Sequence, residues 1–338
     1  MDELQKLYTI KSIGPPEYYL GNDYKKDTKG RFCVGCKKYV KESLIRVEGI
    51  FGSISKCSTP MSPSDHPEED DTDLLDAVQH KVYQQMLGML NWLVTIGRFD
   101  IAFATSSLAR FVACPRKGHL DRLKHVFGYL KKWPNRRIRI DLRDPILIGS
   151  EEVFQKDLMS EFRSDYPNAF EELDPKLPKP FVPEFSITGL VDSDHAHDRR
   201  TRRSITGLFI FIGRTPVMAY SKRQGAIETS TYGAEFNAMK TAVEEITSVR
   251  YMLRCLGVHV NRPSNVFGDN KSVIFNCERR ESLLKKKHTA VAHHKAREAA
   301  AAGIIRPLKI PSKYNYADML TKSLNRKAFC FLRNGVMI

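Results

Sequence analysis

The chain has 338 residues, of which 42% are hydrophobic, and this is enough material for two domains of ordinary size. Lys and Arg number 54 against 39 Asp and Glu, and the formal net charge of +15 favours polyanionic partners, although a protein that is merely basic fits the same numbers. No apolar run approaches the about 18 residues that cross a bilayer, and acidic residues follow Met1, which argues against a signal peptide.

The first half predicts a hairpin, a linker and a group of helices. Residues 15–36 contain two strand-like runs, EYYLGNDY and RFCVG, around a KKDTKG turn, and a basic amphipathic helix follows over 37–46. A domain seldom opens inside such a unit, so we expect residues 1–58 to be the truncated end of a longer domain. Residues 59–77 carry three prolines and a cluster of acids, which is typical of a solvated linker.

Helical spacing of apolar residues predicts three helices between Val78 and Lys132, with a break at 97–100, and short strand-like runs, IRID and ILIG, complete a region that we place at 78–150. Basic residues crowd the last two helices. An ordinary solvated face explains them equally well, but beside a nuclease site they would contact phosphates. The candidate nucleic-acid-binding cations of the whole chain are Arg110, Arg116, Lys117, Arg122, Lys131, Lys132, Lys222, Arg223, Lys285, Lys286 and Lys287.

Cysteine use points away from both zinc and disulfides. Seven cysteines are scattered along the chain, and only Cys33 and Cys36 form a Cys-x-x-Cys pair, without a second pair to complete a zinc site. An odd count without a framework suits a reducing compartment. The short alternation of His195 and His197 with Asp194 and Asp198 does not encode a zinc site by itself either.

Residues 151–183 are acidic, rich in proline and weakly patterned, so we expect a second linker there and a second domain over 184–338. In that domain the predicted order is strand, strand, strand, helix, strand, helix, helix, strand, helix. Four acids fall at element ends or on a buried face of this series. They are Asp192, Glu235, Asp269 and Asp318.

Each acid also has a simpler explanation. Glu235 lies four residues before Met239, on the stripe of the helix 231–256 that faces the sheet. An unpaired acid at such a position costs free energy. The simpler explanation for Glu235 is a structural role at the start of the helix. Asp269 belongs to a Gly-Asp-Asn sequence that is typical of a turn, and Asp318 lies three residues after Asn315, as an acid in the first turn of a helix would. A shared site is therefore indicated only by the four acids taken together.

Four acids suit a centre with two divalent ions. Two such ions about 4 Å apart activate a water on one side of a phosphodiester and stabilise the leaving oxygen on the other. Magnesium prefers oxygen ligands, and clustered carboxylates repel one another without a cation. In this hypothesis Asp192 bridges both ions, Glu235 and Asp269 hold one of them, and Asp318 holds the other. Of the nearby histidines, His288, His293 and His294, we take His294 as a candidate catalytic proton carrier, although a surface histidine is the simpler interpretation.

A resemblance to a known family is carried by segments in both halves: YYLGNDY, MLGMLNWLVTIGRFDIAFATSSLARF, HLDRLKHVFGYLKK, VDSDHAHDRRTRRSITGLFIFIG, SKRQGAIETSTYGAEFNAMKTAVEE, GDNKSVI, KKKHTAVAHHKAREAAAAG and NYADMLTKSL. In this order they resemble the C-terminal part of the Pol polyprotein of copia-type LTR retrotransposons over nearly the whole chain. The first three are similar to the end of its reverse transcriptase region and the helices that follow, and the rest to its ribonuclease H domain.

The resemblance implies an α/β fold, in which a partial reverse transcriptase palm end and a helical thumb or connection region precede a ribonuclease H-like mixed five-stranded sheet with flanking helices. It implies cleavage of the RNA strand of RNA–DNA hybrids with two Mg²⁺ or Mn²⁺ ions, the four acids as metal ligands, and no small-molecule cofactor. The implied partners are nucleic acid, above all the RNA–DNA hybrid, and the rest of the Pol polyprotein. The resemblance implies no membrane partner. The implied location is the cytoplasm, including virus-like particles, or the nucleus.

Some features depart from the family pattern. A polymerase needs an aspartate pair flanked by apolar strand residues, and Asp70-Asp71 lies in the acidic linker instead, so we expect no polymerase activity from this chain alone and place those acids upstream of Met1. Relatives usually carry tryptophan in place of His195 and aspartate in place of Ala290. A non-catalytic nucleic-acid-binding remnant is therefore the alternative function, and an integrase-like nuclease, whose acids follow a different order, is a weaker one.

Overall fold

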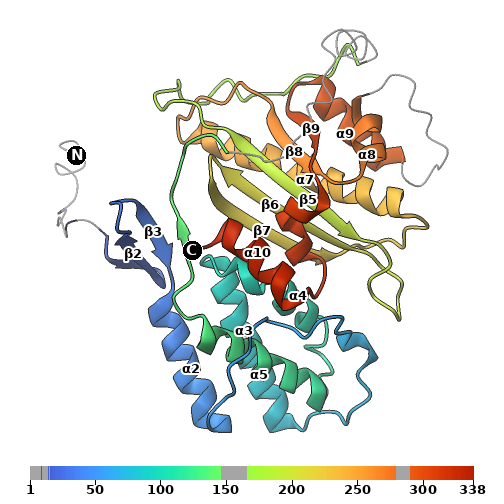
Figure 1. Cartoon of the computed structure of the whole chain (residues 1–338). Helices are drawn as coiled ribbons and strands as arrows, with labels where there is room; N and C mark the ends of the chain where they lie inside the picture. The colour runs from blue at the N-terminus through green and yellow to red at the C-terminus, as the bar shows by residue number, and fades with distance from the viewer. Residues whose placement is uncertain (1–8, 10–13, 15, 146–165, 279–289) are drawn as a thin grey trace.

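The computed structural model describes residues 9, 14, 16–145, 166–278 and 290–338, and Figure 1 shows how they are arranged. In this view a group of helices from the first half lies below a larger sheet with its own helices, and a small antiparallel sheet lies to the left. The small sheet has the order β1-β2-β3-β4. Its strands are β1 (Tyr18–Tyr19), β2 (Asn22–Lys26), β3 (Phe32–Gly35) and β4 (Arg137–Arg139).

The run EYYLGNDY does not form one strand, so the predicted two-stranded hairpin is wrong in this detail. Leu20 and Gly21 both have positive φ angles, 48° and 88°, and they separate β1 from β2 in a tight turn that pairs Tyr19 with Asn22. Two consecutive residues with positive φ are what a two-residue hairpin turn requires, and leucine seldom adopts this conformation. The run IRID supplies β4, whereas the run ILIG lies outside the described residues.

The helices of the first half follow the predicted periodicity. On the longest, the apolar residues Tyr83, Leu87 and Leu90 are buried, and the Asp76 side chain caps its first turn by accepting hydrogen bonds from the backbone N–H groups of Val78 and Gln79. The helices are α2 (Lys37–Phe51), α3 (Ala77–Thr95), α4 (Ala102–Ala109) and α5 (Lys117–Lys132). Short 3₁₀ turns, η1 (Pro67–Glu69) and η2 (Phe99–Ile101), connect them. That this half derives from a reverse transcriptase palm and thumb stays a prediction.

The second half forms the expected mixed five-stranded sheet, with the strand order β7-β6-β5-β8-β9. The strands β7, β6 and β5 pair antiparallel. On the other side of β5, β8 pairs parallel to β5 and β9 pairs parallel to β8. This order places β5 at the centre, so it is buried on both faces. The strands are β5 (Ile187–Asp194), β6 (Ile205–Ile212), β7 (Thr215–Arg223), β8 (Ser264–Gly268) and β9 (Ile305–Lys309).

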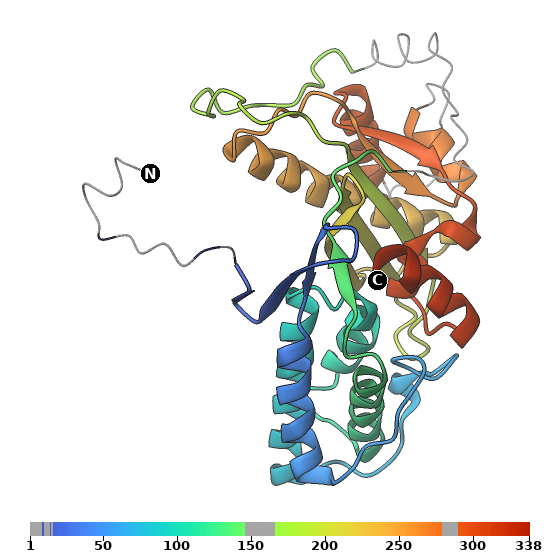
Figure 2. The ribbon, with the colours of Figure 1, turned by 60° about the vertical axis from the view of Figure 1, so that its left-hand side comes forward.

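Two hydrophobic cores cover the two faces of this sheet. Alternate residues of β5 divide between them: Val191 packs with α7, α8 and α9, whereas Leu190 packs in a core that continues into α3, α4 and α5. Figure 2 shows the helices of the first half beneath the larger sheet in a second view. The remaining elements are α7 (Thr231–Cys255), α8 (Lys271–Glu278), α9 (Ala290–Ala301), η4 (Ser312–Tyr314), η5 (Tyr316–Leu320) and α10 (Arg326–Val336).

Both predicted linkers contact the folded parts where the structure describes them. In the first, Glu68 is buried and receives the Arg110 guanidinium at 3.3 Å and the backbone N–H of Arg199 at 3.1 Å. In the second, the Glu171 carboxylate binds Arg250 and Arg254 of α7 at 2.8 and 2.7 Å. The domain boundaries stay predictions. Among the helices of the described residues, none has both the length and the apolarity to cross a bilayer.

Candidate metal centre

Two neighbouring parallel strands bring Asp192 and Asp269 to the same edge of the sheet. Asp192 is the sixth residue of β5, and Asp269 follows directly after β8. The strands are in register with Leu190 opposite Phe267, so a further step of two residues along each strand sets the two aspartates side by side. Asp192 is 3% exposed, which is rare for an acid without a cation.

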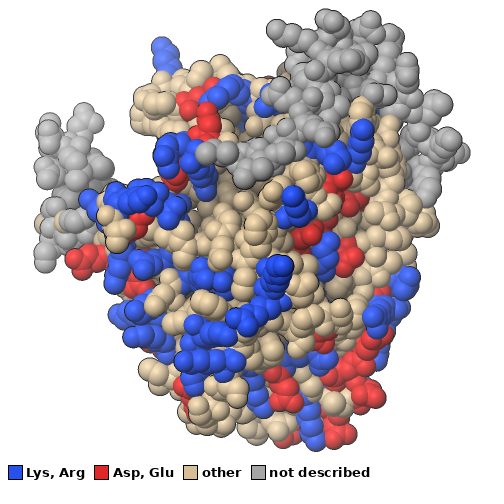
Figure 3. Space-filling view, viewed as in Figure 1, with Lys and Arg blue, Asp and Glu red and all other residues tan. Residues whose placement is uncertain are grey.

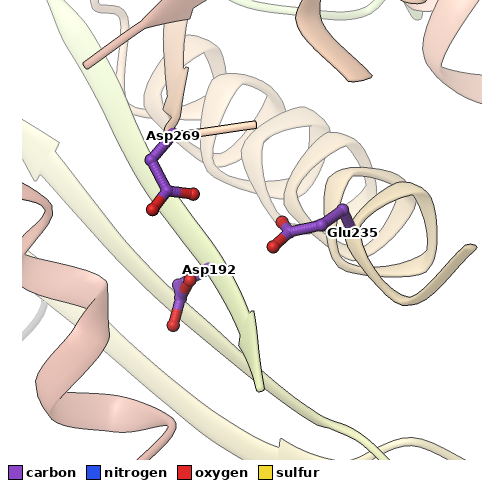
Figure 4. Close-up of side chains that lie close together, drawn as sticks. All are labelled: Asp192, Glu235 and Asp269. Carbon is purple, nitrogen blue, oxygen red and sulfur yellow. The ribbon is translucent and has the colours of Figure 1, made fainter. Parts of the chain in front are cut away.

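The helix α7 supplies the third carboxylate. Ser230 caps the helix by accepting a hydrogen bond from the backbone N–H of Gly233, so the helix begins early enough to place Glu235 on its second turn. Glu235 lies on the same buried stripe as Met239 and is 7% exposed, as its spacing predicts. Figure 4 shows Asp192, Glu235 and Asp269 pointing toward one another, and an oxygen of each lies within 4.8 Å of the others.

Asp318 lies next to this trio but outside the set of mutually close oxygens. It belongs to the 3₁₀ turn η5 rather than to an α-helix, and Asn315 caps this turn by accepting from the backbone N–H of Ala317 at 3.2 Å. The same Asn315 donates its side-chain amide to the carbonyl of Val191 at 2.9 Å, which ties the turn to β5 beside Asp192. Lys322 completes the connection, with its Nζ 3.2 Å from Asp318 Oδ1 and 3.7 Å from Asp192 Oδ2.

Three of the four acids have a raised pKa, and burial is the main cause for each. Burial raises the pKa of Glu235 to about 9, and the charges of Asp192 and Asp269 act in the same direction. Burial likewise raises the pKa of Asp318 to about 7, with the charge of Asp192 as the second cause. The pKa of Asp192 is also raised, first by burial, although Lys322 and the Thr321 hydroxyl oppose the rise. A divalent cation would reverse these shifts, because it favours the ionised carboxylates.

The histidines of the prediction lie in different settings. His294 is exposed on α9, where its ring meets that of the buried His293 edge to face at 5.2 Å, and its catalytic role stays a prediction. His288 lies outside the described residues. His195 bonds through Nε2 to the carbonyl of Glu228, and His197 pairs through Nδ1 with Asp194 at 2.7 Å. Among the described residues, no second group of acids, histidines or cysteines converges as the acidic trio does.

Several predicted phosphate-binding cations have partners inside the protein. Arg110 and Arg223 both bind the buried Asp198, at 2.7 and 2.9 Å, and Arg122 binds Asp65 and Asp70. Further internal bonds join Lys131 to Glu48, Lys132 to the Ser58 hydroxyl and Arg116 to the Thr72 carbonyl. Lys117 is exposed beside Asp73, and Lys222 is exposed. The cations Lys285, Lys286 and Lys287 lie outside the described residues, and the binding role of the whole set stays a prediction.

Other exposed cations were missed by the sequence reasoning. Figure 3 shows Lys and Arg gathered on the left of the molecule, over β2, β3 and α2, and acids gathered at the lower right. The exposed Lys25, Lys26 and Lys29 belong to the β2–β3 hairpin. The three lysines of the KKDTKG turn could have indicated this cationic surface, but a turn of this composition is usually interpreted as a solvated loop.

Comparisons with known proteins find sequence relatives of the chain. No family model matches the chain. It is 24% identical over 330 residues, 97% of its length, to the retrovirus-related Pol polyprotein from transposon RE1 of Arabidopsis thaliana, and 26% identical over 337 residues to the corresponding polyprotein from transposon TNT 1-94 of Nicotiana tabacum. The chain is similar over nearly its whole length to retrovirus-related Pol polyproteins of plant transposons. The match covers 19% and 22% of those relatives, so the chain spans about a fifth of their length.

Among solved structures, the N-terminal RNase H domain of a Mycobacterium tuberculosis protein aligns with 46% of this chain and 98% of its own, at 15% identity and a TM-score of 0.31. The site also contains residues that the sequence reasoning did not single out. Thr321 donates its hydroxyl to Asp192 Oδ2 at 2.5 Å, and Lys322 lies four residues after Asp318, a spacing that predicts an ion pair on any helical turn.

Gly207 is a further residue of the site that the sequence reasoning did not single out. It pairs with Asp192 across β5 and β6, and a Cβ at this position would lie 2.7 Å from Thr321 Cγ2 and 2.8 Å from the carbonyl oxygen of Ala317. The absence of a side chain is therefore what allows η5 to approach the sheet closely enough to bring Asp318 and Thr321 to Asp192. A glycine inside a strand is the only signal in the sequence.

Proposed function

We propose that this chain is a metal-dependent ribonuclease that hydrolyses the RNA strand of RNA–DNA hybrids. The observation that carries the proposal is the convergence of Asp192, Glu235 and Asp269, which come from a strand, a helix and a strand end and point their carboxylates at one another. A protein gains nothing for its stability by clustering three like charges, two of them buried, so a bound cation is the physical reason for the arrangement. The Pol homology supports nucleic acid as the substrate.

The donor set fits a hard divalent cation. All the close ligand atoms are carboxylate oxygens, and two of the three acids are buried, which is the chemistry that Mg²⁺ and Mn²⁺ prefer. We assign Asp192, Glu235 and Asp269 to one ion, and Asp192 with Asp318 to a second. When bound, the ions supply Lewis acidity and a nucleophilic water for phosphodiester hydrolysis.

The protein's own residues position and shield this centre. Thr321 and Asn315 fix the Asp192 carboxylate and the neighbouring backbone by hydrogen bonds of 2.5 and 2.9 Å, so this acid is held in one orientation. The exposed cations, among them Lys117, Lys222 and the lysines of the β2–β3 hairpin, are proposed to bind backbone phosphates, which carry no sequence information. His294 is retained as a candidate proton carrier.

Polymerisation is no part of the proposal. The acid pair Asp70-Asp71 is not proposed as a polymerase site. The Asp70 carboxylate accepts hydrogen bonds from Arg122 at 2.5 Å and from the Thr72 hydroxyl at 2.6 Å, so it stabilises the loop. Because the chain spans about a fifth of the Pol relatives, we propose the remainder of such a polyprotein as its partner. We propose the cytoplasm, including virus-like particles, or the nucleus as its location.

The test is a cleavage assay on a 5′-labelled RNA–DNA hybrid, with duplex DNA and duplex RNA of the same sequence for comparison. We expect cleavage of the RNA strand of the hybrid that requires Mg²⁺ or Mn²⁺, and its loss in Asp192→Asn and in Asp269→Asn. The matched control is Asp174→Asn, because Asp174 is exposed and only accepts a backbone hydrogen bond from Lys176 in a turn. Cleavage that survives Asp192→Asn would refute the assignment.

The same preparation tests the alternative function. A nucleic-acid-binding remnant without turnover would bind the hybrid with strong dependence on salt, and its affinity would not respond to magnesium or to Glu235→Gln. Hybrid binding without cleavage, unchanged by either treatment, is the result that would replace the nuclease proposal with this one.

A further inference from the structure

The ammonium of Lys322 occupies the space between two of the proposed metal ligands. Its Nζ lies 3.2 Å from Asp318 Oδ1 and 3.7 Å from Asp192 Oδ2, and the side chain is 38% exposed, whereas the Asp192 side chain is 4% exposed. Among the described residues, no other Lys or Arg forms an ion pair with either acid within 4 Å. The sequence reasoning assigned no role to this lysine.

A cationic side chain beside the acids offsets the repulsion between their carboxylates. Like charges that are buried together cost free energy, and removing the compensating charge from a buried pair is strongly destabilising. The acids Asp192 and Asp318 would face this cost whenever no divalent ion is bound. An ammonium within 4 Å of a carboxylate oxygen of each acid compensates both.

The lysine also has a place to which it can withdraw. Its side chain lines a cavity of about 560 Å³ together with Asp194, His195, Ser323 and Asn325. A lysine side chain is a compact charge on a flexible four-carbon stem, and this one is partly exposed, so it can rotate away from the two acids without unfolding the turn that carries it. The cavity opens beside the centre and includes Asp194 as another acidic partner.

We propose that Lys322 is a built-in counter-cation that holds the position between Asp192 and Asp318 and has to withdraw before a divalent ion binds there. This inference rests on the proposed metal-dependent function and adds an order of binding to it. The trio Asp192, Glu235 and Asp269 takes the first ion without displacing a protein charge. The second ion competes with the ammonium, so it binds more weakly than it would to the same acids alone.

The test is calorimetric titration of Mn²⁺ into the metal-free full chain, without nucleic acid. We expect the wild type to bind one ion tightly and a second weakly. In Lys322→Met we expect the second ion to bind at least about tenfold more tightly, a difference of ~1.4 kcal/mol, while the first changes much less. Lys322→Arg keeps the charge and should behave like the wild type. The matched control is Lys327→Met, because Lys327 is exposed and lies outside the site.

A second measurement follows the protein without ions. Urea unfolding in EDTA should show Lys322→Met to be less stable than the wild type, and saturating Mg²⁺ should remove most of the difference. Lys322→Gln serves the same purpose if the methionine variant does not fold, because its amide is neutral but still able to donate a hydrogen bond. A purely structural lysine would lower stability equally with and without ions, and that result overturns the proposal.

The outcomes separate this inference from the proposed function. If the wild type binds no divalent ion and cleaves no hybrid, the proposed function fails and the counter-cation proposal fails with it. If the wild type binds ions and cleaves the hybrid, but second-ion affinity in Lys322→Met is unchanged or lower, only the counter-cation proposal is overturned.

Discussion

Replacing Glu235 by glutamine should stabilise the metal-free protein, and the effect should grow with pH. The carboxyl has a pKa of about 9 in the folded protein, raised from an ordinary value of 4.5, first by burial and then by the charges of Asp192 and Asp269. Between these two values the folded state keeps a proton that the unfolded state has lost. Stability therefore falls as pH rises through this window, by about 1.4 kcal/mol for each pH unit.

The magnitude follows from that slope. From about pH 5 to about pH 7.5 the wild type should lose on the order of 3 kcal/mol of unfolding free energy through Glu235. Glutamine keeps the shape and the hydrogen-bonding groups but carries no titratable proton. Glu235→Gln should therefore be similar to the wild type near pH 5 and more stable than the wild type by on the order of 3 kcal/mol near pH 7.5.

The assay is urea unfolding in EDTA, monitored by tryptophan fluorescence at both pH values. The control is Glu244→Gln on the same helix, which removes an exposed acid whose partner is Lys240 at 3.7 Å and should change stability by at most about 0.5 kcal/mol. Added Mg²⁺ should stabilise the wild type and should have a smaller effect on Glu235→Gln. A variant no more stable than the wild type near pH 7.5, or one that keeps the wild-type pH slope, would refute the reasoning.

Three other substitutions test the supports of the site. Thr321→Val removes the hydroxyl that binds the buried Asp192 at 2.5 Å and should lower the unfolding free energy by ~1–3 kcal/mol, measured in urea at neutral pH. Asp198→Ala leaves two arginines without their shared carboxylate and should cost on the order of 3 kcal/mol, seen as a lower thermal midpoint. Gly207→Ala places a Cβ against the turn that carries Asp318 and should weaken Mn²⁺ binding in calorimetry, whereas Gly225→Ala, with open space around it, should not.

The order of elements in the second half was predictable because each element has its own local signal. The three apolar runs, the periodic stripe of α7 and the turn residues between them predicted the order of the five strands and of α7, α8 and α9, whereas the helix predicted to start at Asp318 is the 3₁₀ turn η5. Glu235 was predicted to face the sheet from its spacing to Met239 alone, and it is buried there. Asp192 and Asp269 were predicted as strand-end acids, and the parallel pairing of β5 with β8 brings them together.

The features that were not predicted depend on contacts between distant residues. Nothing near Arg110 in the sequence indicates that its partner is Asp198, which is 88 residues away, so it was interpreted as a phosphate-binding cation. The turn at Leu20 was missed because a positive φ at leucine is set by the pairing of the flanking strands, not by local preference. The role of Gly207 likewise appears only when η5 is seen to pack on the strand.

The first half of the chain contributes to the geometry of Asp192. The Ser221 hydroxyl of β7 donates a hydrogen bond to the carbonyl of Leu320 at 2.6 Å. The same hydroxyl is hydrogen-bonded at 3.0 Å to the hydroxyl of Ser106 in α4. A helix of the first half is thus connected by two hydrogen bonds to the residue before Thr321. Leu320 is also buried in the core that those helices share with the sheet. Because Thr321 in turn holds the Asp192 carboxylate, we expect a change in α4 to be transmitted to this acid through hydrogen-bonded and packed contacts. The orientation of the central carboxylate is therefore set partly by helices that precede residue 150, and the pattern of residues 184–338 contains no trace of this dependence.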